Sequence, residues 1–174
     1  MRALPICCVV FAAASAGAAP KKWDYADFWT IAGVTFTDSP EAVIKKWGRP
    51  GEDHVVAGDR ELRYEHGAQV SFRADGGIQL DYVAYSKADR DALSAHPDPK
   101  LELLGMTCEQ AAGRLAFAKK VSMYTTCKHY DANHWMLDVT LTCNKTVNGM
   151  TIVWYPLGDK VDPNKLPASH CNET

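Results

Sequence analysis

Two short segments of this chain begin with the same helix-capping chemistry, and strand-like sequence follows each of them. In the later segment, Thr107 can cap a helix and Gln110, three residues on, can reach back to complete a capping box. Ala111 and Leu115 follow at helical spacing, so one face of this helix is apolar. We therefore predict a helix over about 108–118.

The earlier segment repeats this arrangement. Ser39 takes the cap position, and Pro40 stands at the first helical position, where its missing N–H costs nothing. Val43 and Trp47 fall where Ala111 and Leu115 fall, and Gly48 then ends the helix. The fold class that we predict is α+β: two tandem units, each a short helical segment packed on an antiparallel sheet of about four strands.

Alternating apolar residues predict the strands of both units. The first unit has strands at 61–66, 68–73 and 78–85. The second unit has one at 121–127, and residues 134–143 give the cleanest alternation in the chain.

The dipeptide Asn148-Gly149 is a strong hairpin signal. A two-residue turn there would place Cys143 opposite Trp154. The predicted organisation is a signal peptide, a first repeat, a linker, a second repeat and a C-terminal tail, at 1–19, 20–85, 86–99, 100–155 and 156–174.

The first 19 residues read as a secretory signal peptide. Arg2 precedes an apolar run at 6–14, which is too short to span a bilayer, and small residues follow that fit a cleavage site between Gly17 and Pro20. Cleavage there also removes Cys7 and Cys8. We expect a periplasmic or secreted product without stable membrane insertion.

Four cysteines remain after cleavage: Cys108, Cys127, Cys143 and Cys171. An even number in an exported chain indicates disulfides, and four cysteines allow three pairings. We favour Cys127–Cys143 within the second repeat and Cys108–Cys171 to hold the tail. A zinc site is the weaker alternative, because the chain has no C-x-x-C motif.

Composition and motifs narrow the function classes. The net charge is −2 and no Lys/Arg run stands out, so a nucleic-acid partner is not expected. The chain has no G-x-S-x-G, H-E-x-x-H, phosphate-loop or dinucleotide motif. We therefore expect no enzyme activity, no cofactor and no metal site.

His129 and His134 flank a polar connection, and they offer the one alternative to a non-catalytic protein. They would serve a small exported hydrolase or bind a metal, but two surface histidines beside a turn are more often solvated. Cys127 lies two residues from His129, and the exported setting favours a disulfide for it over a nucleophile.

Aromatic side chains on the predicted strands are the candidate partner-binding residues. Adjacent strand residues point to opposite faces, so Trp154 and Tyr155 cannot both lie in the core. Rings that point away from the core would anchor a partner. With two residues of predicted hairpin turns, the candidate set is Tyr82, Tyr85, Trp135, Trp154, Tyr155, His66 and Asp75.

The short motifs of both units carry a family resemblance. They are Trp47-Gly48-Arg49-Pro50, Leu62-Arg63-Tyr64, Val70-Ser71-Phe72 and Gly105-Met106-Thr107. In this order the chain resembles the tandem-repeat β-lactamase inhibitor proteins, and it is similar to the related unit of the outer-membrane assembly lipoproteins of the SmpA/OmlA type. Two tandem copies favour the inhibitor architecture, and the resemblance covers roughly residues 36–155.

The resemblance implies two helix-and-sheet units whose sheets grip an enzyme. The inhibitor family inserts an aspartate from a first-repeat hairpin turn, whereas the matching turn here, Glu65–Ala68, has none, which argues against a β-lactamase target. The acylated cysteine of the lipoproteins is also missing. We expect an exported, non-catalytic protein-binding module, an inhibitor or immunity protein that blocks an enzyme or toxin; the alternative is an envelope assembly accessory protein.

Overall fold

The computed structural model describes residues 20–131, 134–158, 161–162 and 165–173. The predicted signal peptide at 1–19 lies outside these described residues. None of the helices within them is long and apolar enough to cross a bilayer.

Both predicted helix starts are confirmed. α1 (Pro40–Trp47) begins after Ser39, whose hydroxyl accepts a hydrogen bond from a first-turn amide at 3.2 Å. α3 (Cys108–Arg114) begins after Thr107, which exchanges the two hydrogen bonds of a capping box with Gln110, at 2.9 and 3.2 Å. These side chains satisfy backbone N–H groups that a helix start leaves unpaired.

α3 is shorter than the predicted 108–118. Leu115 adopts an extended conformation and forms a β-bridge with Trp23, and backbone hydrogen bonds of 2.8 Å on either side of it join Trp23 to residues 114 and 116. The backbone of Trp23 thus forms hydrogen bonds with N–H and C=O groups that would otherwise be available to a further turn of α3. The remaining helical elements are α2 (Lys87–Ser94) and the 3₁₀ helices η1 (Tyr25–Trp29), η2 (Glu65–Gly67) and η3 (Pro99–Leu103).

A continuous antiparallel sheet carries these helices, which confirms the α+β class. Its eight strands follow the order β10-β7-β8-β9-β6-β5-β4-β3, and a separate pair is formed by β1 and β2. The strands are β1 (Thr30–Ile31), β2 (Val34–Thr35), β3 (Glu52–Val56), β4 (Asp59–Arg63), β5 (Ala68–Phe72), β6 (Ile78–Val83), β7 (Tyr124–Tyr130), β8 (Trp135–Asn144), β9 (Thr146–Pro156) and β10 (His170–Glu173).

The two halves of the sheet come from different parts of the chain. β3 to β6 form one half and β7 to β10 the other, and the halves meet where β6 pairs with β9. In this register Ile78 lies opposite Trp154, and Tyr82 lies opposite Met150. The structure therefore has one eight-stranded sheet, and its division into two tandem units stays a prediction.

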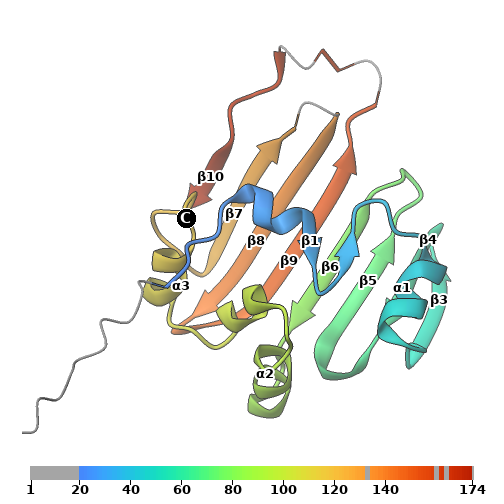
Figure 1. Ribbon diagram of the computed structural model, residues 1–174, viewed down its shortest axis with the longest axis horizontal. Helices are drawn as coiled ribbons and strands as arrows, with labels where there is room; N and C mark the ends of the chain where they lie inside the picture. The colour runs from blue at the N-terminus through green and yellow to red at the C-terminus, as the bar shows by residue number, and fades with distance from the viewer. Residues whose placement is uncertain (1–19, 132–133, 159–160, 163–164, 174) are drawn as a thin grey trace, which may run out of the picture.

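The core lies on one face of this sheet. η1 crosses in front of β7, β8 and β9 in Figure 1, and α1 lies over the strands of the other half. Under η1, the Trp154 indole N–H donates to the backbone carbonyl of Phe28 at 3.1 Å, and both side chains are fully buried. Trp47 of α1 contacts the rings of Tyr64 and Tyr82 from the same side.

The cysteines pair differently from our prediction. The disulfides are Cys108–Cys143 and Cys127–Cys171, so the favoured Cys127–Cys143 and Cys108–Cys171 pairs are wrong. The register explains this. Cys127 lies opposite Val139 on β8, four residues from Cys143, a separation of roughly 13 Å along the strand. β10 instead places Cys171 directly opposite Cys127.

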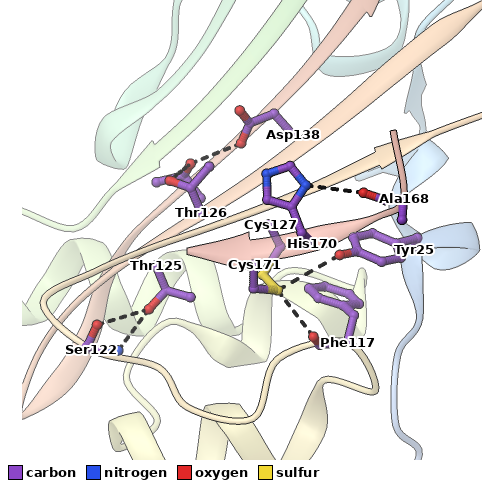
Figure 2. Close-up of a disulfide and its surroundings, with 11 residues drawn as sticks. Tyr25, Phe117, Ser122, Thr125, Thr126, Cys127, Asp138, Ala168, His170 and Cys171 are labelled. Atoms are coloured by element: carbon purple, nitrogen blue, oxygen red, sulfur yellow. Dashed lines mark hydrogen bonds between the residues drawn. A yellow bond between two sulfur atoms is a disulfide. The ribbon is translucent and has the colours of Figure 1, made fainter. Parts of the chain in front are cut away.

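The Cys127–Cys171 bond lies beside the aromatic side chains of Tyr25, from the N-terminal segment, and Phe117, which follows α3 (Figure 2). The Tyr25 hydroxyl donates to the Cys171 sulfur at 3.9 Å, and the Phe117 carbonyl oxygen lies 3.2 Å from that sulfur. The rings of Tyr25 and Phe117 stack at a centroid distance of 4.2 Å. The C-terminal strand is therefore held covalently and by packing.

The predicted turn at Asn148-Gly149 is also wrong. The chain reverses at Lys145, which has a positive φ of 66°, so that Cys143 pairs with Val147 and not with Trp154. Gly149 lies inside β9, and a Cβ there would lie 3.4 Å from Thr142. The glycine therefore serves close packing across the irregular β8–β9 register.

We expect removal of either disulfide to lower stability, and removal of the two to differ in its effect on hydrogen exchange at β10. C127S/C171S and C108S/C143S variants should each lose about 2–4 kcal/mol of unfolding free energy, because both bonds close long loops. Amide hydrogen exchange should rise at β10 and the facing edge of β7 only in C127S/C171S, since β10 has no other neighbouring strand. Peptide mapping of the non-reduced protein tests the pairing itself; recovery of a Cys127–Cys143 peptide would contradict it.

Candidate functional site

The face of the sheet opposite the helices is the candidate site. Strand alternation divides β8 cleanly: Leu137, Val139 and Leu141 are buried under the helices, whereas Asp138 and Thr140 point to the other face and are partly exposed. We call this second surface the open face. It runs across all eight strands of the sheet.

One row of side chains crosses the whole open face. From β10 to β3, the cross-strand register aligns Asn172, Thr126, Thr140, Thr151, Asp81, Gln69, Arg63 and Glu52. Hydrogen bonds join many neighbours: Thr126 to Thr140 at 3.0 Å, Thr151 to Asp81 at 2.7 Å, and Arg63 to Gln69 at 3.1 Å. These contacts hold the polar side chains in defined positions before any partner binds.

A parallel row contains Asp138. Its carboxylate accepts a hydrogen bond from Thr140 at 3.2 Å, and the Lys128 ammonium lies 3.9 Å away. Burial raises the pKa of Asp138 above its ordinary value, and the Thr140 hydrogen bond and the Lys128 charge act against this rise. Next in the row is Val153, an apolar side chain only 6% exposed. The centre of the open face thus combines a partly desolvated carboxylate with a small apolar floor.

Aromatic side chains lie at the ends of the open face. Tyr130, Met136 and Tyr155 are aligned by the register at the end where β8 begins, and the Arg73 guanidinium lies 5.3 Å from the centre of the Tyr155 ring. Tyr124, at the opposite end of β7, is 60% exposed. Tyrosine and arginine are, with tryptophan, the residue types enriched among the residues that contribute most to protein–protein binding.

Three rings of the predicted partner-binding set belong to the covered face. Tyr82 and Trp154 are 2% and 0% exposed, so neither is available to a partner. Trp135 is partly exposed and packs on Phe36 at a centroid distance of 4.9 Å. All three side chains share the strand parity of the core, as Leu137 does. Burial contradicts the predicted role of Tyr82 and Trp154, and the role of Trp135 stays a prediction. Tyr155 is the strand aromatic of the predicted set that reaches the open face.

The other predicted residues lie at turns. Asp75 accepts a hydrogen bond from the Gly77 amide at 3.0 Å and pairs with Arg73, so its first role is to shape the β5–β6 turn. His66 sits in η2 with a positive φ of 58°, and its Nδ1 lies 3.3 Å from an Asp89 carboxylate oxygen of α2.

Tyr85 follows β6 and is 82% exposed. Its ring forms one side of a hollow of about 440 Å³ at the edge of the open face. Arg63, Asp81 and Val83 belong to the lining of the same hollow. The structure therefore brings Tyr85 into the open face, although it does not lie on a strand.

The predicted catalytic alternative gains no support from the histidines. The His129 ring stacks on Tyr25 at 4.7 Å, and its Nδ1 lies 2.7 Å from the Ser169 hydroxyl. His134 has a positive φ of 65° at the start of β8. Within the described part of the chain, no group of three or more His, Cys, Asp or Glu side chains is placed to hold a metal ion.

Sequence reasoning missed the polar rows of the open face. The signal was present in the alternation of residues 134–143, where Asp138, Thr140 and Thr142 occupy the positions between apolar residues. The prediction gave weight to the aromatic residues instead, and several of these lie on the covered face. Comparison of the chain with protein-family models, with curated proteins and with solved structures gives no match.

Trp154 and Tyr155 provide a matched test of the two faces. Trp154→Ala should lower the unfolding free energy by about 3–5 kcal/mol, because it empties a fully buried site. Tyr155→Ala should cost about 1 kcal/mol or less, since the ring is only partly buried. Urea unfolding measures both, and similar costs for the two variants would contradict the assignment of the faces.

The raised pKa of Asp138 predicts that the stability difference between wild type and Asp138→Asn depends on pH. Because its pKa is raised in the folded protein, the folded state holds more protons between the ordinary pKa of 3.8 and the raised value. Stability then falls as the pH rises through this window, and the full cost remains above it. Asp138→Asn should therefore be more stable than wild type at pH 7, with the difference shrinking toward pH 3 in urea unfolding. A less stable variant at pH 7 would show that the attraction of Lys128 outweighs burial.

Proposed function

We propose that this protein is an exported, non-catalytic binding module that blocks a partner protein, an enzyme or toxin, in the manner of an inhibitor or immunity protein. The observation that carries the proposal is the open face. Helices cover one side of the eight-stranded sheet (Figure 1). The other side presents ordered polar rows with tyrosines at the ends.

The chemistry of the open face suits a protein partner. Its charges are mixed, with Arg63 and Lys128 on either side of Asp81 and Asp138, so a partner needs a complementary pattern of charges and not a single opposite charge. The hydrogen bonds along the row reduce the entropy lost when these side chains are fixed by binding. Tyr124, Tyr130 and Tyr155 supply anchors around the polar centre.

The resemblance to the tandem-repeat β-lactamase inhibitors supports the same proposal. In that reading, β3 to β6 with α1 form one unit and β7 to β10 with α3 form the other. Two disulfides fit an exported chain, as the predicted signal peptide does. The β4–β5 turn that would carry the inhibitory aspartate is η2 here, with His66 at its centre, so we assign a target other than a β-lactamase.

The proposal is tested by affinity capture with a matched pair of substitutions. Thr140→Arg places a long cationic side chain in the middle of the open face, and Thr37→Arg makes the same change at an exposed position before α1. From a periplasmic extract, wild type and T37R should retain the same protein at a fixed stoichiometry, and T140R should lose it at least tenfold.

Mass spectrometry then identifies the captured protein, and its activity is assayed with and without one equivalent of wild type. We expect loss of that activity with wild type and T37R, and retention with T140R. Circular dichroism establishes that T140R is folded. Equal capture by T140R and wild type would place the binding surface elsewhere, and recovery of no specific protein would overturn the proposed function.

A further inference from the structure

The hollow beside Tyr85 lies at one end of the open face, where β6 ends. Asp81, Val83 and Tyr85 alternate along β6 and its continuation, so their side chains stand on the same face of the sheet. All three line the hollow, which has a volume of about 440 Å³. A carboxylate, a small apolar side chain and an aromatic ring therefore follow one another along it.

The Asp81 side chain forms part of the wall of this hollow. β6 pairs with β5 on one side and with β9 on the other, so its backbone is covered and the partly exposed Asp81 reaches the hollow through its side chain. One carboxylate oxygen accepts a hydrogen bond from the Thr151 hydroxyl at 2.7 Å, and the other accepts one from the Gln79 amide at 2.8 Å. An ionised carboxylate has about four acceptor positions, so each oxygen can take a further hydrogen bond.

The charge of this carboxylate is not offset by a cation. Thr151 and Gln79 are neutral, and no cationic side chain within the described residues lies within 4.0 Å of Asp81. Arg63, the cation of the lining, is bound to Glu61 at 3.0 Å and to Glu52 at 3.3 Å. Taken with these two carboxylates, the lining has a net negative charge, which favours a cationic group from a partner.

The Tyr85 ring gives this cationic group an aromatic surface. The ring is 82% exposed, and one of its carbons lies 3.5 Å from where a Cβ of Gly67 would be. Gly67 has a positive φ of 74°, and a Cβ there would lie 2.0 Å from the Val83 carbonyl oxygen, so this packing requires glycine. A long cationic side chain can cover such a ring with its apolar stem or with its charge.

The spacing of the two ends of the hollow favours arginine as that side chain. Four residues of extended chain separate Asp81 from Tyr85, which is roughly 13 Å between their Cα atoms, so a short side chain cannot contact both. A guanidinium binds a carboxylate through two parallel hydrogen bonds and stacks on aromatic rings. A lysine ammonium is a hydrated point charge and makes neither contact as well.

We propose that the partner of this protein inserts an arginine side chain into the hollow, with its guanidinium at Asp81 and its aliphatic stem against Val83 and Tyr85. This inference rests on the proposed function and specifies the partner further: the surface that the open face covers carries an exposed arginine. On binding, the guanidinium supplies the charge that Asp81 does not receive from its neutral neighbours.

Titration with three blocked amino acids tests the hollow without a captured partner. The probes are the N-acetyl methylamides of arginine, lysine and citrulline, and citrulline has nearly the shape of arginine without its charge. Binding is followed at constant ionic strength by NMR chemical shifts of the Gly67 and Val83 amides. We expect the arginine probe to bind at least threefold more tightly than the lysine probe, and the citrulline probe to give no saturable shifts.

Substitutions separate the two contacts of the arginine probe. Asp81→Asn should weaken its binding at least fivefold, because it removes the charge and keeps an oxygen that can accept from Thr151. Tyr85→Ala should weaken it at least threefold, whereas Tyr85→Phe, which keeps the ring, should bind as wild type does. Asp91→Asn removes an exposed carboxylate of α2 outside the lining and should change nothing.

The captured partner provides the second test. Tyr85→Ala should weaken its binding at least tenfold and Tyr85→Phe less than threefold. When the arginines of the partner are replaced by alanine one at a time, one replacement should weaken binding to wild type and have little further effect on binding to Asp81→Asn, as expected of two residues in direct contact.

Two results would overturn the inference. One is equal binding of the arginine and citrulline probes. The other is a partner that Thr140→Arg loses but that wild type, Asp81→Asn and Tyr85→Ala bind equally, and this result would leave the proposed function standing. Failure of the proposed function is a different observation, the recovery of no specific protein by wild type.

Discussion

The pairing of β6 with β9 is the contact on which the rest of the structure depends. It joins residues 78–83 to residues 149–154, and the Thr151–Asp81 hydrogen bond across it links positions 70 residues apart in the chain. With this contact, neither half of the sheet has an edge in the middle of the molecule. The covered core and the open face both become continuous across the junction, so the two halves are stabilised together. Ordering a contact of such long range costs loop entropy, and the apolar pairs around Trp154 offset it.

The difference between the two faces follows from the side-chain period of two in a strand. Trp154 is fully buried under η1, and Tyr155, the next residue, lies on the open face beside Arg73. The helices bury the apolar side chains of one face. On the other face, the polar side chains form hydrogen bonds with one another along the rows. A surface that is already paired resists nonspecific contact, since a partner must match several fixed polar groups at once. In the proposed function, the open face therefore offers specificity.

Local chemistry made much of this fold predictable. Capping residues at Ser39 and Thr107 gave the starts of α1 and α3, and the alternation in residues 134–143 gave β8 with the correct parity. Contacts that depend on register were not predictable. The disulfide partner of Cys127 depends on the pairing of β10, and no periodic pattern in the sequence predicts that strand. The chain reverses between β8 and β9 at Lys145, although Asn148-Gly149 nearby is the stronger turn signal. For the site, the sequence could show that neighbouring aromatics face opposite ways, but not which of them lies under η1.

The two outer margins of the sheet are protected by different means. β3 is short and carries Glu52 and Asp53, which pair with arginines of β4, and such charges discourage the addition of a foreign strand. β10 shields β7 and is attached by the Cys127–Cys171 bond. Reduction of this bond would remove the covalent attachment, so that only the hydrogen bonds and packing of β10 would keep the margin of β7 covered. Self-association is thereby coupled to oxidation: we expect the reduced protein to form intermolecular strand pairs more readily than the protein in which this bond is present.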